Sequence, residues 1–235
     1  IIDSREKLSG ELSKIIKKYE FKIFLNHVVS TIHGKYSVKS VEVAPITEDG
    51  KDLAAQPLKI YTDLVVMSGG WTPIVNLFSQ SGGKLEWDES NSFFKPSKYL
   101  QSCLCIGGSN GNFDMQECID KTISQSNLIL RRIGKKKKSK VAFKASYLNV
   151  DYKSRNIWHI PNGRISGKGG KAFIDFQNDV TASDIHLASK EGYVSVEHLK
   201  RYTTTGMATD QGKTSNINAL AILANILNKP IEEVG

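Results

Sequence analysis

Residues 104–111 constrain the fold most, because an apolar run there ends directly in a glycine-rich loop. The run is Leu104–Ile106, the loop is Gly107-Gly108-Ser109-Asn110-Gly111, and apolar residues at helical spacing follow Asp114. A glycine-rich loop before a helix offers backbone N–H groups and the positive end of the helix dipole to an anion such as a pyrophosphate. We therefore expect an α/β nucleotide-binding domain, with Gly107 and Gly108 as candidate ligand-binding residues.

A second apolar run has a similar ending. Asp63–Met67 breaks at Gly69-Gly70, and Pro73 suits the first turn of a helix. Glycine at the break lets the backbone approach a ligand without a Cβ in the way. The pattern predicts a buried strand, a turn and a helix; a simple strand-to-helix turn without a ligand fits it equally well.

The segments around these runs alternate between helical and strand patterns. Ile1-Ile2-Asp3 has the pattern of the end of a buried strand, and its acid could bind a ribose hydroxyl or cap a helix. In the first case a Gly-x-Gly-x-x-Gly motif would precede residue 1, and the sequence would be part of a longer polypeptide. Spacing predicts a helix at 5–19, a hairpin at 26–43 that turns near Gly34, and strands at 21–25, 58–61 and 93–96.

The last part of the sequence is helical in pattern. Thr181 and Asp184 have the spacing of a capping box and predict a helix that ends near Gly192. Two more helices are predicted at 194–202 and 216–227, with a loop rich in hydroxyl groups between them. We therefore divide the chain into a partial nucleotide domain at 1–133, a linker at 134–171 and a small all-α domain at 172–235.

Composition excludes some classes of protein and leaves others open. The 235 residues contain no apolar run long enough for a transmembrane helix and no secretory signal at the start. The net charge is +8, and Lys135–Lys138 with Lys140 could bind nucleic acid, although a solvated linker explains this run better. Cys103 and Cys105 could form a redox or metal pair, but two buried thiols are the favoured interpretation. Few cysteines also indicate a reducing compartment.

Residues 175–215 resemble a small helical iron–sulfur module, the ferredoxin-like domain of several amine and amino-acid oxidoreductases. The shared frame consists of Val180-Thr181, Lys200-Arg201, Gly206-Met207 and Gln211-Gly212-Lys213. The four positions that hold the cluster in that domain are here Asp175, Gln177, Asp210 and Ser215. Because thiolates hold such clusters, the resemblance implies a ferredoxin-like domain that has lost its cluster.

The sequence is also similar to one family in particular, the alpha subunit of heterotetrameric sarcosine oxidase. The similar phrases are Ser68–Pro73, Phe78–Glu89 and Lys200–Lys213, in family order. This resemblance implies a partial FAD/NAD(P)-binding Rossmann-like domain followed by the cluster-less helical domain. It also implies that a C-terminal folate domain, which would use tetrahydrofolate, begins beyond Gly235.

The resemblance assigns cofactors and partners as well. It implies NAD in this chain, with contacts at Gly108, Phe113 and Met115, because Gly108-Ser109 stands where a flavoprotein usually has Gly-Asp. It implies FAD and FMN in the complex, with FMN at the boundary of the alpha and beta subunits near Lys200, Thr203 and Thr204. The partners would be beta, gamma and delta subunits in the cytoplasm. No catalytic residue and no metal ligand is assigned to this chain.

Several alternatives remain open. Phe113 and Met115 could be core residues at a helix start, and Lys200 and Arg201 could offset the dipole at a helix end. The nucleotide could be FAD, and the substrate could be dimethylglycine. The chain could also belong to an opine, proline or cyanide-forming dehydrogenase, to a disulfide reductase that uses Cys103 and Cys105, or to a basic nucleic-acid-binding module.

Overall fold

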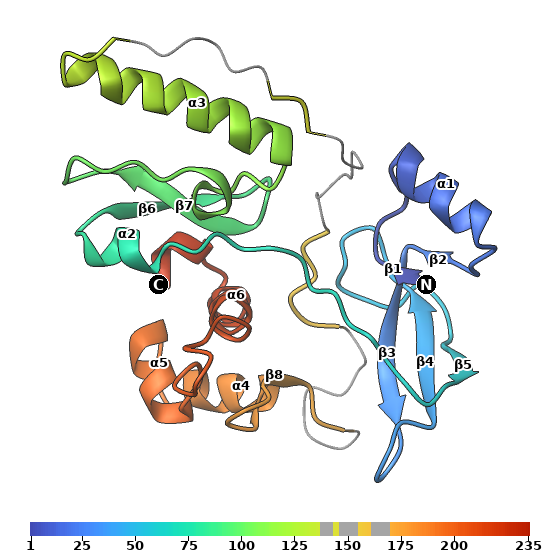
Figure 1. Cartoon of the computed structure of the whole chain (residues 1–235). Coiled ribbons are helices and arrows are strands. Elements are labelled where there is room, and N and C mark those ends of the chain that lie inside the picture. Colours follow the sequence, from blue (N-terminus) through green and yellow to red (C-terminus); the bar gives the residue numbers. More distant parts are fainter. Residues whose placement is uncertain (137–142, 146–154, 161–169) are drawn as a thin grey trace. The chain divides into compact units, whose positions relative to one another are not determined.

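The structure is a computed structural model that describes residues 1–136, 143–145, 155–160 and 170–235 (Figure 1). The chain divides into two compact units. The first consists of Ile1–Lys7, Tyr19–Ser68 and Ser154–Gly235, and the second of Leu8–Lys18 and Gly69–Lys153. The predicted domain boundaries at residues 133 and 172 stay a prediction, since this division follows compactness alone.

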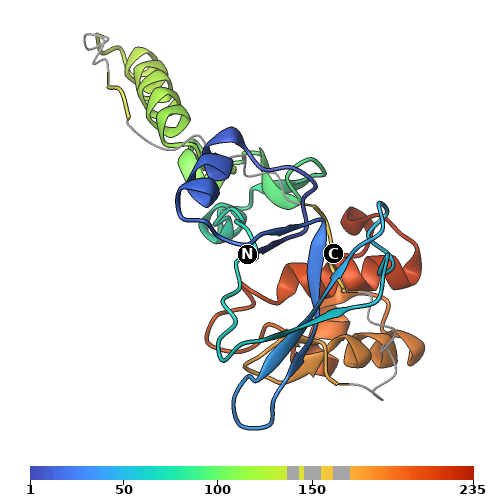
Figure 2. The ribbon, with the colours of Figure 1, turned by 90° about the vertical axis from the view of Figure 1, so that its right-hand side faces the viewer.

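The N-terminal part of the first unit is built from two small sheets. Strands β1 (Ile2–Asp3) and β2 (Phe24–Leu25) pair in parallel. Strands β3 (His27–His33), β4 (Ser40–Pro45) and β5 (Leu58–Tyr61) form an antiparallel sheet in that order. The β3–β4 hairpin is the long blue hairpin of Figure 2, and it turns at 34–39 as predicted. Its buried apolar residues are Val28, Val41, Val43 and Ala44, and Ile46 directly after β4 is buried as well.

The first helix begins later than predicted. Helix α1 spans Gly10–Lys18, whereas the apolar spacing predicted a start at Arg5. The Asp3 carboxylate accepts the backbone N–H of Arg5 at 2.9 Å and its guanidinium at 3.0 and 2.7 Å. This hydrogen bonding to Arg5 lowers the pKa of Asp3 and holds residues 3–5 in a turn that a helix could not share.

The predicted buried strand at 63–67 is wrong. The segment is extended but unpaired, and Leu64, Val66 and Met67 are 69, 84 and 74% exposed. An apolar strand becomes a buried strand only when neighbours take up its backbone groups and cover its side chains. Among the described residues no strand pairs with this segment. The strand predicted at 104–106 is missing for the same reason.

The second unit contains a helix, a hairpin and the glycine-rich loop. Helix α2 (Asn76–Gln80) starts three residues after Pro73, and strands β6 (Lys84–Asp88) and β7 (Phe93–Lys98) form an antiparallel hairpin. The strand predicted at 93–96 corresponds to β7, whereas β6 was not predicted. A short 3-10 helix η1 (Gly107–Asn110) precedes helix α3 (Met115–Arg132), which begins where Asp114 predicted.

Residues 172–235, called here the helical module, follow the prediction closely. The helices are α4 (Ala182–Lys190), α5 (Val196–Thr203) and α6 (Asn216–Leu227), with a short 3-10 helix η2 (Ile231–Glu233). Strands β8 (Phe173–Asp175) and β9 (Val180–Thr181) were not predicted. The capping box is present, since the Asp184 carboxylate accepts the Thr181 N–H at 2.8 Å. Ile185, Leu199 and Leu223 are fully buried and form the centre of the module's core.

Candidate nucleotide-binding site

Aromatic contacts in the second unit bring together two segments that are distant in sequence. The rings of Trp71 and Phe113 lie 6.0 Å apart between centroids, with a tilt of 35°. Phe93 of β7 packs edge-on against Phe113, also at 6.0 Å. Phe93 is 4% exposed and therefore forms the base of this cluster. The segment that follows the glycine pair at 69–70 thus lies beside the glycine-rich loop at 107–111.

The loop needs glycine at two positions for different reasons. Gly107 has φ +66° and Gly111 has φ +75°, in the left-handed region that side chains disfavour. A Cβ at Gly111 would also lie 2.7 Å from the Phe93 ring. Gly108 has no such strain, and a Cβ there would meet Phe113 at an ordinary 3.8 Å. Gly108 is also exposed, so its backbone is open to a ligand.

The start of α3 is less suited to an anion than the sequence suggested. Asp114 caps the helix, and its carboxylate accepts the Glu117 N–H at 2.7 Å. A second carboxylate, Glu117, lies in the first turn. Glu117 is paired with Lys121, but the Asp114 carboxylate already interacts with the positive end of the dipole and would repel a phosphate there. A nucleotide at this loop is therefore expected to present its base or ribose, not its pyrophosphate, to α3.

The structure brings four of the predicted residues together. Gly107 and Gly108 begin η1, Phe113 precedes the helix cap, and Met115 is the first residue of α3. Phe113 packs on Trp71 and Phe93, which agrees with the alternative that it is a packing residue. Met115 is 58% exposed and is not a core residue. Sequence reasoning did not name Trp71 or Phe93, although aromatic residues beside glycine-rich segments were a visible signal.

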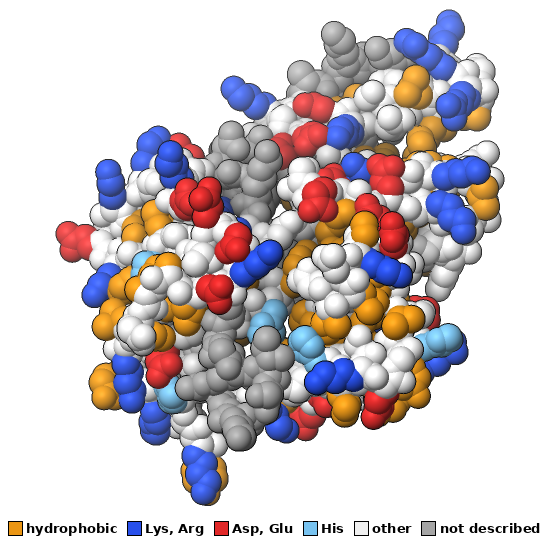
Figure 3. Space-filling view, turned by 180° about the vertical axis from the view of Figure 1, so that it is seen from behind, with side chains coloured by type: hydrophobic (Ala, Val, Ile, Leu, Met, Phe, Trp, Pro, Cys, Tyr) orange, Lys and Arg blue, Asp and Glu red, His pale blue; other side chains and the backbone are white. Residues whose placement is uncertain are grey.

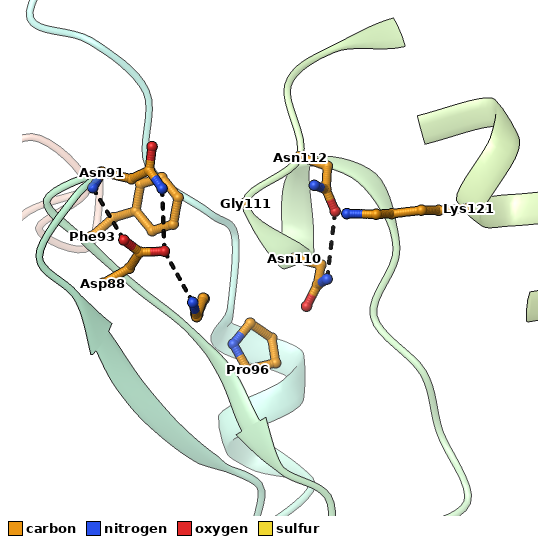
Figure 4. Close-up of a pocket in the computed structure, with 9 residues that line it drawn as sticks. Asp88, Asn91, Phe93, Pro96, Asn110, Gly111, Asn112 and Lys121 are labelled. Carbon is orange, nitrogen blue, oxygen red and sulfur yellow. Dashed lines mark hydrogen bonds and ion pairs between the residues drawn. The ribbon is translucent and has the colours of Figure 1, made fainter. Parts of the chain in front are cut away.

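A polar pocket of about 280 Å³ lies between the β6–β7 hairpin and the glycine-rich loop (Figure 4). The loop contributes Asn110, Gly111 and Asn112, and the hairpin contributes Asp88, Asn91 and Lys95. The side chains of Asn110 and Asn112 point toward one another, with a long 3.5 Å hydrogen bond between their amides. The lining thus offers amide groups that suit a neutral hydrogen-bonding ligand.

The charged side chains of this pocket are already paired. Lys95 lies 3.0 Å from Asp88 and 3.5 Å from Glu86, and Lys121 lies 2.5 Å from Glu117. Burial alone would raise the pKa of Asp88, but hydrogen bonds from Ser90, Lys95 and Asn91 outweigh it and hold the pKa far below its usual range. Asp88 therefore stays ionised, and the pocket has no spare cation for a phosphate.

The cysteines of this unit show no sign of a redox pair. Cys103 is exposed, Cys105 is half-buried, and all three cysteines are free thiols. The favoured interpretation of two buried thiols is therefore wrong for Cys103, because the strand that would have buried it does not form. Burial raises the pKa of Cys118, whose thiol donates to the Asn112 carbonyl at 3.2 Å. Its role is to hold the loop against α3.

In the helical module, two of the four cluster positions, Asp175 and Gln177, hydrogen-bond to the same loop. Asp175 is 3% exposed, and its carboxylate accepts the N–H groups of Gln177, Asn178 and Gly206 at 2.8–3.1 Å. The Gln177 carbonyl oxygen accepts the Thr209 hydroxyl at 2.7 Å. These bonds join the end of β8 to the 204–209 loop. They hold residues 175–215 together in one compact unit, as the resemblance to the ferredoxin-like domain requires.

The other two cluster positions, Asp210 and Ser215, differ from one another. Asp210 accepts the Gly212 N–H at 3.1 Å and the Thr214 hydroxyl at 2.9 Å. These two hydrogen bonds, that from Thr214 first, lower the pKa of Asp210. Ser215 is completely buried at the start of α6, and its hydroxyl has no hydrogen-bond partner. Among the residues that the structure describes, no group of three His, Cys, Asp or Glu side chains could hold a metal ion.

The residues predicted near FMN lie at the end of α5. Lys200 and Arg201 are in its last turn, where cations offset the helix dipole, as the alternative held. The Thr203 hydroxyl donates to the Leu199 carbonyl at 2.8 Å, so its hydrogen is already used. Thr204 is exposed and left-handed at φ +62°, and its hydroxyl donates to the Thr203 carbonyl at 2.6 Å. This cluster and the glycine-rich loop belong to different units.

The sequence similarity to known proteins is extensive. The profile of the Sarcosine oxidase A3 domain family matches residues 169–235. Sarcosine oxidase subunit alpha of Rhizobium meliloti (strain 1021) is 36% identical over 176 residues, which cover 75% of this chain and 17% of the relative. The same subunit of Corynebacterium sp. (strain P-1) is 30% identical over 231 residues, or 97% of this chain and 23% of the relative.

The chain belongs to the sarcosine oxidase alpha subunit family. This confirms the family resemblance that the sequence phrases indicated. The chain spans about a fifth of the length of these curated relatives. A third member, from Corynebacterium sp. (strain U-96), is 28% identical over the same 97% of the chain.

One solved structure shares the fold of this family member. The crystal structure of L-proline dehydrogenase from P.horikoshii superposes with a TM-score of 0.59 over 95% of this chain and 44% of that chain. The sequence identity is only 15%, so the likeness shows a common mixed α/β fold and nothing more. It confirms the α/β class; the Rossmann-like assignment and the lost iron–sulfur site remain part of the proposal below.

The surface gives little support to a nucleic-acid-binding module. On the face drawn in Figure 3, cationic and anionic side chains are interspersed and do not form one basic stripe. Of the basic run, Lys137, Lys138 and Lys140 lie outside the described residues. In the part of the chain that the structure describes, no helix has the length and apolar character that crossing a bilayer requires.

Proposed function

We propose that this chain is part of the alpha subunit of a sarcosine oxidase. The whole enzyme would oxidise sarcosine to glycine, with hydrogen peroxide and either methylene-tetrahydrofolate or formaldehyde as products. The observation that carries the proposal is the similarity to sarcosine oxidase alpha subunits over 97% of the chain. Beta, gamma and delta subunits would complete a cytoplasmic heterotetramer, with FAD and FMN in the complex and tetrahydrofolate bound outside this segment.

In this proposal the second unit is the closing part of a Rossmann-like NAD site. The exposed Gly108 backbone, the Phe113 ring and the first residue of α3, Met115, would contact the cofactor. The left-handed Gly107 keeps that approach free of side chains. The carboxylates at the start of α3 fit the base or ribose of NAD and not its pyrophosphate. NAD would supply an ordered nucleotide at this site, without a redox step assigned to this chain.

The helical module would be a ferredoxin-like domain without its cluster. In iron–sulfur proteins, hydrogen bonds to the sulfurs help to stabilise and tune the cluster. Here the carboxylates of Asp175 and Asp210 accept backbone N–H groups at two of the four cluster positions. These carboxylates supply negative acceptors where the cluster would have been, which explains how the scaffold persists without metal. The exposed end of α5, with Lys200, Thr203 and Thr204, would face the FMN-bearing subunit.

The test of the activity uses the protein with every subunit that co-purifies with it. We expect sarcosine-dependent oxygen uptake with stoichiometric hydrogen peroxide. For the NAD site, Gly108→Val should weaken NAD binding because its branched side chain would cover the backbone, whereas the fold tolerates a Cβ there. Absence of oxygen uptake with sarcosine would contradict the proposed activity. Unchanged NAD affinity in Gly108→Val would contradict the proposed NAD site.

The fold likeness to L-proline dehydrogenase favours a second candidate, a large subunit of an amino-acid dehydrogenase. Such an enzyme would reduce an artificial dye with proline and would leave oxygen unused. Parallel assays with sarcosine and proline decide between the two. Dye reduction with proline alone would replace the first proposal by the second.

A further inference from the structure

We propose that Trp71 is a binding residue of the nucleotide site, where its ring stacks on the base of the NAD molecule. The inference rests on the proposed NAD site and adds a residue that the family resemblance did not assign. It follows from an exposed ring, from two open glycine pairs beside that ring, and from the charges that surround them.

The Trp71 ring is held in place yet mostly uncovered. It packs against Phe113 at 6.0 Å, and Phe113 in turn rests on the buried Phe93. Two residues along, Pro73 is buried and would lie 3.7 Å from a Cβ at Gly111. Trp71 itself is 70% exposed. A large ring that is anchored on one side and open on the other is the arrangement that base stacking requires.

The backbone beside the ring is also open. A Cβ added at Gly69 or at Gly70 would meet no atom within 4 Å, and Gly70 has φ +96°. Gly108 is exposed as well, and a Cβ there would lie 3.8 Å from the Phe113 ring. A flat ligand could therefore approach two stretches of bare backbone while its ring lies on Trp71. Side chains at these glycines would block that approach.

The surrounding charges select the part of NAD that binds here. Asp114 and Glu117 occupy the start of α3, and Lys121 is already paired with Glu117 at 2.5 Å. A phosphate would meet the Asp114 carboxylate and no free cation from these residues. An aromatic base carries no such penalty, and the Asn110 amide oxygen in the neighbouring pocket can accept a ribose hydroxyl.

Tryptophan fluorescence tests the inference directly. The protein, isolated with its co-purifying subunits and freed of nucleotide, is titrated with NADH. Excitation of tryptophan should give sensitised emission from the bound nicotinamide. Trp71→Ala should weaken NADH binding about tenfold, in line with the loss of one stacked base. Trp71→Phe should keep most of the affinity, because a phenyl ring can still stack on a base, and this variant also controls for misfolding.

The matched control is Trp87→Phe, since Trp87 lies in the same unit but packs on Phe94 of the hairpin. It should leave NADH affinity unchanged. If NADH binds and Trp71→Ala leaves its affinity unchanged, the Trp71 inference is wrong and the NAD site stands. If Trp71→Ala instead releases a subunit and spares NADH affinity, the ring is an interface residue and the inference fails. No NADH binding by the unchanged protein overturns both.

Discussion

The helical module and the glycine-rich part of the second unit differ in how much of their predicted secondary structure forms and is buried. In the module, α6 alone buries six residues, Ala219–Ala224, and its helices start and end close to where their caps predicted. In the second unit, the 18-residue helix α3 buries none. The apolar run at 104–106 forms no strand, and neither does the run at 63–67, which belongs to the first unit.

The difference follows from where each element finds its partners. A helix satisfies its own backbone groups, and the module's three helices cover one another. A strand of a parallel sheet cannot satisfy its own backbone N–H and C=O groups. It needs neighbouring strands on both edges and cover on both faces. The module therefore carries its own core, whereas the apolar run at 63–67 presents exposed residues such as Leu64 and Val66.

The largest expected effect tests that contrast with one type of substitution in both regions. Leu223→Ala removes a fully buried side chain of α6 and should cost about 2–5 kcal/mol of unfolding free energy. Leu128→Ala in α3 removes a 43% exposed side chain and should cost below about 1 kcal/mol. Urea unfolding followed by circular dichroism measures both. Equal losses would show that α3 is as well covered as α6 and would break the comparison.

The next prediction concerns the carboxylates at the former cluster positions. Asp175→Ala leaves three backbone N–H groups without their acceptor in a buried place, and should cost about 2–3 kcal/mol. Asp210→Ala, at a more exposed position, should cost less. Thermal unfolding of the two variants gives the order. If Asp210→Ala proves the more damaging, Asp175 is not the centre of the network.

A smaller effect is expected in the glycine-rich loop. Gly111→Ala places a Cβ in the left-handed region against the Phe93 ring, and should cost about 1–2 kcal/mol. Gly108→Ala lacks both problems and should be nearly neutral for stability. Denaturant midpoints of the two variants check this. A neutral Gly111→Ala would mean that the Phe93 contact is not tight.

The smallest effect is a pH dependence that arises from His159. Burial, and then the neighbouring His186, lower the pKa of His159. The unfolded chain then binds a proton near the ordinary histidine pKa of about 6.5 before the folded chain does, so stability should fall as pH falls through that value. His159→Gln should flatten this slope, and the exposed His198 gives the control His198→Gln. An unchanged slope in His159→Gln would assign the dependence to another group.

Sequence reasoning predicted the elements that depend on local chemistry. The Thr181–Asp184 capping box, the α3 start at Asp114 and the full span of α6 all follow from neighbouring residues. It failed where a side-chain interaction overrides the apolar spacing, since the Arg5–Asp3 interaction delays α1. It also failed where distant partners decide, since the strands predicted at 63–67 and 104–106 lack pairing among the described residues. Strand β6 was missed because Lys84–Asp88 has too few apolar residues to signal a strand.

The candidate site was predictable in part for the same reason. The loop at Gly107–Gly108 is visible in the sequence, because glycine pairs mark a bare backbone. Trp71 and Phe113 are 42 positions apart in the sequence, and no local pattern predicts the contact between their rings. The sequence marked Asp114 as the residue where the helix begins. Its effect on a phosphate follows only from the structure, in which its carboxylate accepts the Glu117 N–H.

The central claim is that this chain holds NAD at a nucleotide site and also contains a ferredoxin-like module without a cluster. The direct test denatures the protein with its co-purifying subunits, identifies the released nucleotides by mass, and measures iron and acid-labile sulfide in the same sample. We expect one NAD for each copy of this chain, and no iron or sulfide. Iron with sulfide in stoichiometric amounts, or flavin as the sole nucleotide, would contradict the account.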